Sequence, residues 1–111
     1  PSADIKVESN LADYNLTENI KVIESKGGNS TVKETIETWT YNLSITSNLD
    51  RNASLEVTDS KPAEARILEI SPDPKEITAT SLKWDLPLSS RQKMAVIYSY
   101  AVTRTESLGG L

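Results

Sequence analysis

Side chains that support catalysis are few in this sequence. It contains no cysteine and no histidine, which excludes thiol nucleophiles, histidine-based triads, ordinary zinc sites and haem ligation. Acids are plentiful, with 16 Asp and Glu in 111 residues. Those in β-prone segments, such as Glu34, Glu56 and Asp85, alternate outward as on a solvated face, which does not favour a carboxylate pair for hydrolysis. We therefore expect no catalytic residues, no cofactor and no enzyme activity.

Oxygen-rich loops are the remaining candidates for a metal site. Calcium needs several oxygens around one point, and Asp50, Asn52 and Asp59 form one candidate group. Asp73 and Glu76 form a second. Neither group has the spacing of an EF-hand loop, and acids in sandwich loops are usually solvated. We therefore expect no metal ligands.

Glycosylation is the clearest chemical signal in the sequence. Two of the Asn-x-Ser/Thr motifs, at Asn29 and Asn52, lie in predicted turns where an attached sugar would reach solvent. We therefore name Asn29 and Asn52 as candidate glycosylation sites. The alternative left open is that a Ser/Thr-rich β surface generates such motifs by chance. All four motifs begin at Asn15, Asn29, Asn42 and Asn52.

Aromatic side chains could form a sugar-binding platform or a core. A platform needs a row of exposed rings, whereas a Trp or Tyr inside a protein buries a large area. Five of the six rings occupy the apolar phase of their segments, which favours core packing; only Tyr14 lies outside the alternation. The five are Trp39, Tyr41, Trp84, Tyr98 and Tyr100.

Apolar residues alternate with polar ones far more often than they recur at helical spacing. About seven or eight strands, with turn signals roughly every 8–12 residues, predict an all-β fold in the form of an antiparallel β-sandwich. Residues 82–102 show the strongest pattern, in which two alternating segments flank a polar turn. We expect these segments to fold back on each other as a hairpin that anchors the core.

One long β-prone segment, residues 31–47, changes phase in its middle. Val32 and Ile36 occupy even positions, whereas the apolar residues from Trp39 onward occupy odd ones. Because a slip of one residue exchanges the two faces of a strand, we expect a bulge, or a strand that changes sheets, near residues 37–38. Two separate strands with a kink are the alternative. Before this segment, residues 26–29 (Lys-Gly-Gly-Asn) predict a turn.

Length, charge and the ends of the chain indicate its organisation. The length of 111 residues fits a single domain over residues 1–111. The first residue is Pro1 and residues 103–111 are polar with two glycines, so we expect a piece of a longer protein that ends in a linker or tail.

A net charge of −4 without a basic cluster argues against nucleic acid as a partner. No apolar segment approaches the ~18–20 residues of a membrane span, so we expect no membrane insertion by this segment.

The segment TYNLSITSNLDRNASLEVTDSKP resembles immunoglobulin-like repeats of archaeal and bacterial cell-surface proteins. The family pattern is a Tyr-x-Leu-x-Ile strand, an Asn-containing turn, a Val-x-Val-type strand and Asp-x-x-Pro, followed later by Leu-x-Trp-x-Leu and a strand ending in Tyr-x-Val. The chain departs from the family in lacking glycine in both turns and in having Lys61 where an apolar residue is usual. The matching residues are Tyr41, Leu43, Ile45, Asn48, Leu55, Val57, Asp59, Pro62, Leu82, Trp84, Leu86, Tyr100 and Val102, with the second turn at residues 89–93.

This resemblance implies that the fold is an immunoglobulin-like antiparallel β-sandwich. It also implies a stalk, spacer or adhesion module outside the cell, without catalytic residues. The leading hypothesis is a non-enzymatic structural or adhesive repeat of a secreted or cell-surface prokaryotic, archaeal-type protein. Its partners would be neighbouring domains of the same chain and a surface protein or glycan. The alternative is a carbohydrate- or protein-binding accessory module attached to an enzyme. Some such repeats carry a Lys–Asn crosslink between first and last strands, but residues 94–103 contain no Asn or Asp, so we do not expect one.

Overall fold

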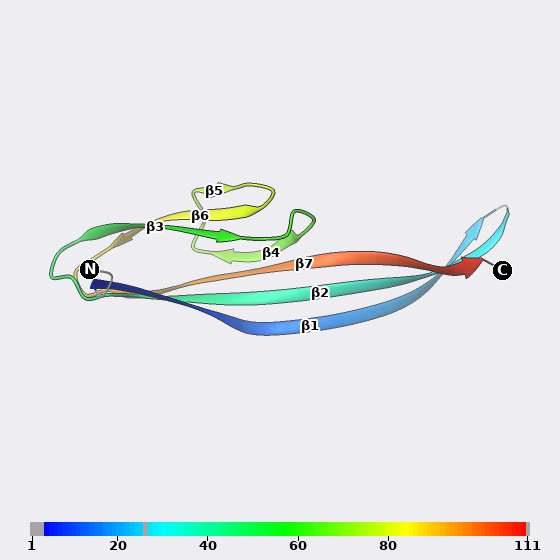
Figure 1. Ribbon diagram of the computed structural model, residues 1–111, viewed down its shortest axis with the longest axis horizontal. Coiled ribbons are helices and arrows are strands. Elements are labelled where there is room, and N and C mark those ends of the chain that lie inside the picture. Colours follow the sequence, from blue (N-terminus) through cyan, green and yellow to red (C-terminus); the bar gives the residue numbers. More distant parts are fainter. Residues whose placement is uncertain (1–3, 26, 111) are drawn as a thin grey trace.

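The chain folds into two antiparallel β-sheets. The computed structural model describes residues 4–25 and 27–110. One sheet has the order β1-β2-β7-β4 and the other β3-β6-β5, which confirms an all-β structure with the two layers of a sandwich (Figure 1). Within the described residues no helix is long and apolar enough to cross a membrane. The strands are β1 (Ile5–Ser25), β2 (Gly28–Ser47), β3 (Ala53–Ser60), β4 (Arg66–Ser71), β5 (Glu76–Ile77), β6 (Ser81–Leu88) and β7 (Lys93–Gly110).

The core lies between the small sheet and one half of the large sheet. Figure 1 shows β3, β5 and β6 stacked over β7 and β4, at the end of the molecule where β1 begins. Alternate residues of β6 and β7 point into this layer because side chains of a strand alternate between its two faces. The buried apolar side chains that form the core cluster are Leu43, Ile45, Val57, Leu82, Trp84, Leu86, Leu88, Val96, Tyr98 and Tyr100.

The expected hairpin over residues 82–102 is wrong. β6 pairs with β3 and β5, whereas β7 pairs with β2 and β4, so the polar turn between them connects the two sheets. A hairpin and a connection between two sheets produce the same alternation in the sequence, because in both cases the inward side chains of the two strands pack into one core. The anchoring role is confirmed, since Trp84 and Tyr98 contact each other across the layers at 5.7 Å between ring centroids.

The expected bulge near residues 37–38 is also wrong, as is a kink at that place. β2 is one continuous strand, and Glu37 and Thr38 keep regular partners in both β1 and β7. The register shifts lie elsewhere. One is in β1 between Leu11 and Asp13, and the other is opposite Thr31 and Val32 of β2, where β7 has the extra residue Leu108. The apolar residues of β2 change face without any change in the backbone.

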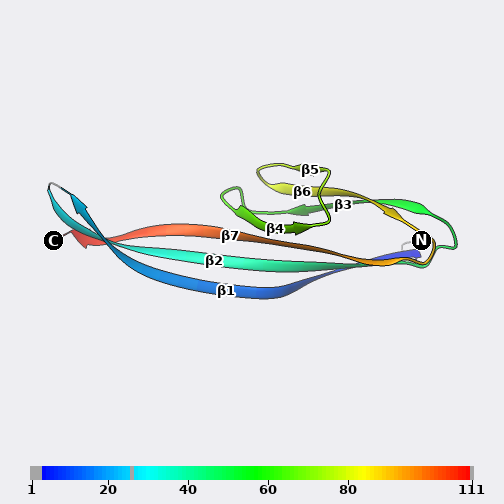
Figure 2. The same ribbon diagram turned by 180° about the vertical axis from the view of Figure 1, so that it is seen from behind.

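A change of environment along β2 explains that switch. Beyond Trp39 the small sheet ends, and β1, β2 and β7 continue alone as a three-stranded ribbon (Figure 2). β7 remains paired with β2 through Gly110, so residues 103–110 form a strand rather than the expected linker; Leu111 lies outside the described residues. Of the turn expected at residues 26–29, Gly27 is a turn residue between β1 and β2, whereas Gly28 and Asn29 already belong to β2, with Gly28 opposite Ser25. Lys26 lies outside the described residues. The result is a body of 69 × 22 × 19 Å.

Candidate functional site: an aromatic cluster beside an open edge strand

All six aromatic side chains of the protein join in one cluster. β2 and β7 supply four of them from directly opposed positions on one sheet face, β1 supplies Tyr14 from the edge, and β6 supplies Trp84 from the other sheet. The centroid separations are Tyr14–Trp39 5.6 Å, Trp39–Tyr100 5.5 Å, Tyr41–Tyr98 5.4 Å, Tyr41–Tyr100 6.0 Å, Trp84–Tyr98 5.7 Å and Tyr98–Tyr100 6.3 Å. These distances are within the range of favourable aromatic pairs.

The inner end of the cluster is structural. Trp84 is fully buried, and its Nε1 donates a hydrogen bond to the carbonyl oxygen of Pro72 at 3.0 Å. The hydroxyl of buried Tyr98 donates to the carboxylate of Asp59. Burial, reinforced by this hydrogen bond, raises the pKa of Tyr98 far above its ordinary value, and burial likewise raises the pKa of Tyr100. Both phenols therefore stay neutral and serve packing rather than proton transfer.

The outer end of the cluster is open to solvent. Tyr14 is exposed and Trp39 is half-buried, with their rings inclined at 49°. The Tyr14 hydroxyl donates to Oε2 of Glu37 at 2.7 Å, and this hydrogen bond raises the pKa of Tyr14. Arg104 Nη1 lies 3.2 Å from Oε1 of the same carboxylate. Two rings beside a charged pair can contact a ligand by stacking and hydrogen bonding, but their inclination does not give a flat platform.

The edge strand β1 continues this exposed surface along the molecule. Tyr14 is opposite Trp39, and the residues that alternate with Tyr14 along β1 share its face. The small sheet lies over β7 and β4, whereas β1 is at the opposite edge of the large sheet (Figures 1 and 2). The exposed apolar side chains of the row are Val7, Leu11, Tyr14, Leu16, Ile20 and Val22.

The predicted glycosylation sites lie far apart. Asn29 is exposed near the start of β2, opposite Glu24 at the ribbon tip. Asn52 lies in the loop between β2 and β3, where its Oδ1 accepts a hydrogen bond from the Ser90 backbone amide at 3.3 Å. Both side chains reach solvent, so both sites stay predictions. Asn42 differs, because its Oδ1 is buried and no hydrogen-bond partner is found for it within the described residues.

The loop acids considered as calcium ligands do not gather in space. Asp50 pairs with Arg91 at 2.6 Å, and Asp59 accepts from Tyr98. Within residues 4–25 and 27–110 no three Asp, Glu, His or Cys side chains come together in a way that could hold a metal ion. No cavity is found in the same part of the chain. Asp50 and Asp59 thus act singly, one as an ion-pair partner and the other as a hydrogen-bond acceptor.

Sequence reasoning missed the role of β1. It placed Tyr14 outside the alternation and predicted no single strand over Ile5–Ser25. The signal was present but interrupted: Leu11 and Tyr14 lie on one face although they are three residues apart, because the bulge at Ala12 adds a residue between them. A single alternating row along β1 becomes visible only once that bulge is known.

Comparisons with known proteins give no relative. No protein-family model matches the sequence, and neither the curated proteins nor the solved structures contain a match.

Proposed function

We propose that this chain is a non-enzymatic spacer or presentation module of immunoglobulin-like type, in a secreted or cell-surface prokaryotic protein. The observation that carries the proposal is the axial arrangement of its strands. β1 begins at the sandwich end and β7 ends at the ribbon tip (Figure 1), and the long axis measures 69 Å. Domains joined to the two ends of this chain would be held apart by that length.

The strand pairing supports resistance to pulling along this axis. β1 and β7 both run from the sandwich toward the tip, and β2 runs back between them with paired residues along both. Hydrogen bonds of an antiparallel ladder are perpendicular to the strands. A force applied at the start of β1 and the end of β7 therefore shears many hydrogen bonds together instead of opening them one by one.

Single-molecule pulling tests this proposal. The chain is placed between two identical reference domains and stretched from its ends; we expect one cooperative rupture with a gain in length of about 300 Å, from ~3.4 Å per extended residue less the folded length. The control applies force between a cysteine at Gly27 and the end of β7, both at the ribbon tip, where the strands are peeled apart. Rupture at equal force in both geometries would contradict a mechanical role.

Modification at Asn29 or Asn52 would support export of the parent protein. Both residues are exposed. Asn29 lies near the start of β2 and Asn52 lies in the loop after β2, so a sugar at either position would not disturb the core. We expect hexose-bearing peptides at one or both positions in protein isolated from its native source, measured by mass spectrometry. Unmodified peptides covering both positions would remove this support.

A binding module is the second candidate, and the exposed pair of Tyr14 and Trp39 favours it. Glu37 and Arg104 beside these rings offer hydrogen-bonding groups to a glycan. Trp84→Phe would leave Trp39 as the only Trp, so its fluorescence reports on this surface alone. A saturable change on titration with oligosaccharides, abolished by Tyr14→Ala, would support binding, and an unchanged spectrum would exclude it for the sugars used.

A further inference from the structure

We propose that two copies of this chain associate through the open edge of β1, antiparallel, with Thr17 of each copy opposite Thr17 of the other. β1 is the outermost strand of the large sheet and, among the described residues, pairs only with β2. One side of its 21-residue backbone therefore offers a row of amide and carbonyl groups to another strand. Addition of a strand to such an edge is a general mode of recognition.

The side chains along this edge favour a covered state. Leu11, Tyr14, Leu16, Ile20 and Val22 all lie on one face of β1 and are 46–62% exposed. Glu18 is the one charged residue between Leu16 and Ile20 on this face. An isolated exposed Leu or Ile is ordinary, whereas a row of five exposed apolar side chains on an edge strand marks an interaction surface. A second strand alongside β1 would place its own side chains against this row.

The charged residues of β1 indicate that the strand beside it is β1 of a second copy, and they determine the register of the pairing. Like charges directly opposite in a sheet are destabilising and opposite charges are favourable. A two-fold axis at Glu18 or at Lys21 would set that residue against itself. Among axes from Leu16 to Lys21, only one at Thr17 brings opposite charges directly across from each other: Asp13 of each copy faces Lys21 of the other.

The bulge in β1 fits the same register. On the β2 side, Thr40 is opposite Asp13 and Tyr41 is opposite Leu11, with Ala12 as the extra residue. A second β1 that follows this pattern places its Lys21 opposite Asp13 and its Val22 opposite Leu11. Ile20 then faces Tyr14 and Glu18 faces Leu16. Most of the exposed row thus gains an apolar partner, and no like charges meet.

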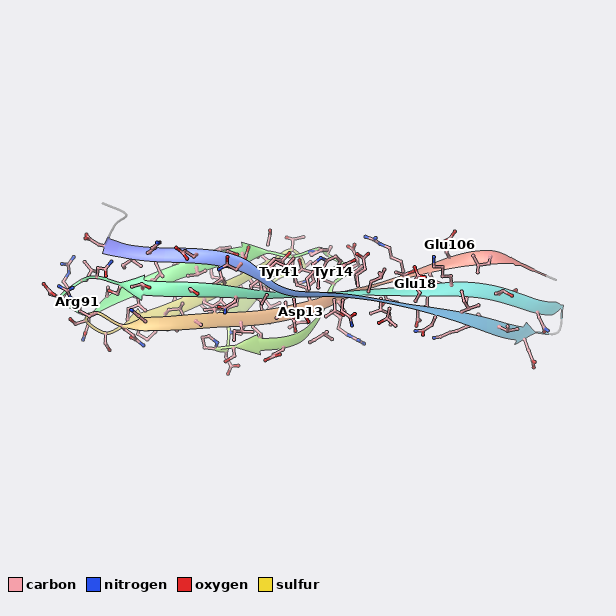
Figure 3. All side chains as sticks on the ribbon, turned by 90° about the horizontal axis from the view of Figure 1, so that it is seen from below. Asp13, Tyr14, Glu18, Tyr41, Arg91 and Glu106 are labelled. Carbon is pink, nitrogen blue, oxygen red and sulfur yellow. The ribbon has the colours of Figure 1, made fainter. Side chains whose placement is uncertain are left out.

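Both charged groups are accessible for this contact. Asp13 is exposed and has no ion pair within the described residues, and Figure 3 shows it beside Tyr14 at the middle of the molecule. Lys21 pairs with Glu34 at 3.2 Å and is 54% exposed, so its ammonium group can serve Asp13 of a second copy as well. The contact between Asp13 and Lys21 occurs two times in the dimer, as does every contact in a two-fold interface.

Charge exchange tests the proposal by analytical ultracentrifugation over a concentration series. We expect a wild-type dimer, and at least ~10-fold weaker association for Asp13→Lys and for Lys21→Glu, because each reverses two contacts. Mixing these two variants should restore a dimer of mixed composition by native mass spectrometry. Asp73→Lys is the control matched to Asp13→Lys in net charge, since Asp73 is exposed in a loop away from β1. Urea unfolding checks that each variant is folded.

Cysteine crosslinking tests the register in a protein that otherwise has no cysteine. Thr17→Cys should form a disulfide dimer under mild oxidation, since opposed residues in antiparallel strands are ~4.5–5.5 Å apart at Cα and a disulfide spans that distance. Asn19→Cys should not crosslink to itself but should crosslink to Asn15→Cys. A wild-type monomer at every concentration overturns the proposal. Open-ended polymers, a mixture that fails to dimerise, or preferential crosslinking of Asn19→Cys to itself would also overturn it.

Discussion

Trp84 lies at the centre of the core, with none of its surface exposed. It contacts Tyr98 across the layers and satisfies its indole nitrogen with Pro72. We expect Trp84→Ala to lower the free energy of unfolding by about 3–5 kcal/mol, because it leaves a large cavity. Urea unfolding followed by circular dichroism measures the change. Trp39→Ala should have a smaller effect since Trp39 is only half-buried, and equal losses would contradict this assignment of the core.

The buried phenols give stability a dependence on alkaline pH. Folded Tyr98 keeps its proton well above pH 10, whereas in the unfolded chain it releases the proton near pH 10. The unfolded state then binds fewer protons, so the free energy of unfolding falls as pH rises above about 10, by roughly 1.4 kcal/mol per pH unit for each such tyrosine. Stability from this group is fully present below that pH.

A Tyr98→Phe variant separates this effect from other groups that titrate at high pH. Its melting temperature, followed from pH 9 to 12, should fall less steeply than that of wild type, because one of the two buried phenols is gone. Burial of the new ring keeps the packing, while Asp59 loses its hydrogen-bond donor. Parallel curves for the two proteins would mean that Tyr98 ionises as readily in the folded state as in the unfolded one.

Residue types and alternation are sufficient to place the core but not its surroundings. Trp84, Tyr98 and Tyr100 are buried as predicted, because period-two alternation depends only on which face meets the core. Lys61 could not be placed in this way. Its side chain is buried, and its ammonium donates to the carbonyl of Ala79 at 2.7 Å. That partner is 18 residues away and becomes adjacent only through the fold.

At the scale of elements, the sequence reveals strands more reliably than their partners. The turn after Leu88 looks the same whether it closes a hairpin or connects two sheets, so β6 and β7 were paired wrongly. The phase change in β2 was interpreted as a bulge although it marks the end of the overlying sheet. In both cases the missing information is which elements lie across from each other, and local propensity does not contain it.

The ribbon formed by β1, β2 and β7 should be the least stable part of the fold. Past Trp39 it has no second layer, and its exposed apolar side chains, such as Ile20 and Val22, contribute little burial. Protection from exchange follows local packing. We expect amides of residues 16–24 to exchange faster than those of residues 41–45, measured by NMR in a dimer-deficient variant. Equal protection of residues 16–24 and residues 41–45 would contradict this gradient.

Two adjacent glycines at the ribbon tip, Gly27 and Gly28, allow a substitution and its control to be compared in the same turn. Gly28 has a φ of 123°, which L-residues rarely adopt, whereas an added Cβ at Gly27 meets nothing within 4 Å. Gly28→Ala should destabilise the turn by about 1–3 kcal/mol and speed exchange in the ribbon alone. Gly27→Ala should leave exchange almost unchanged. A similar response to both substitutions would show that backbone conformation does not control the tip.

At the scale of the molecule, shape separates the sandwich from the ribbon. The Cα radius of gyration is 20.0 Å, against about 13 Å for a compact chain of this length. The difference comes from the ribbon, which extends the body along its long axis (Figure 2). Of the side chains in the core cluster, none comes from residues 15–38. The sandwich should therefore fold without that part of the ribbon.

A shortened chain tests this division. Tyr14 and Trp39 are directly opposed, so a two-residue Asn-Gly turn can replace residues 15–38 with the register kept, and the chain then ends at Val102. We expect cooperative unfolding with Trp84 still buried, and a radius of gyration of about 12 Å by X-ray scattering, as for a compact chain of ~80 residues. The shortened chain should also stay monomeric, since it lacks Thr17 and Lys21. A chain that fails to fold would instead make the ribbon part of the structural core, and the long strands would then stabilise the sandwich as well as extend it.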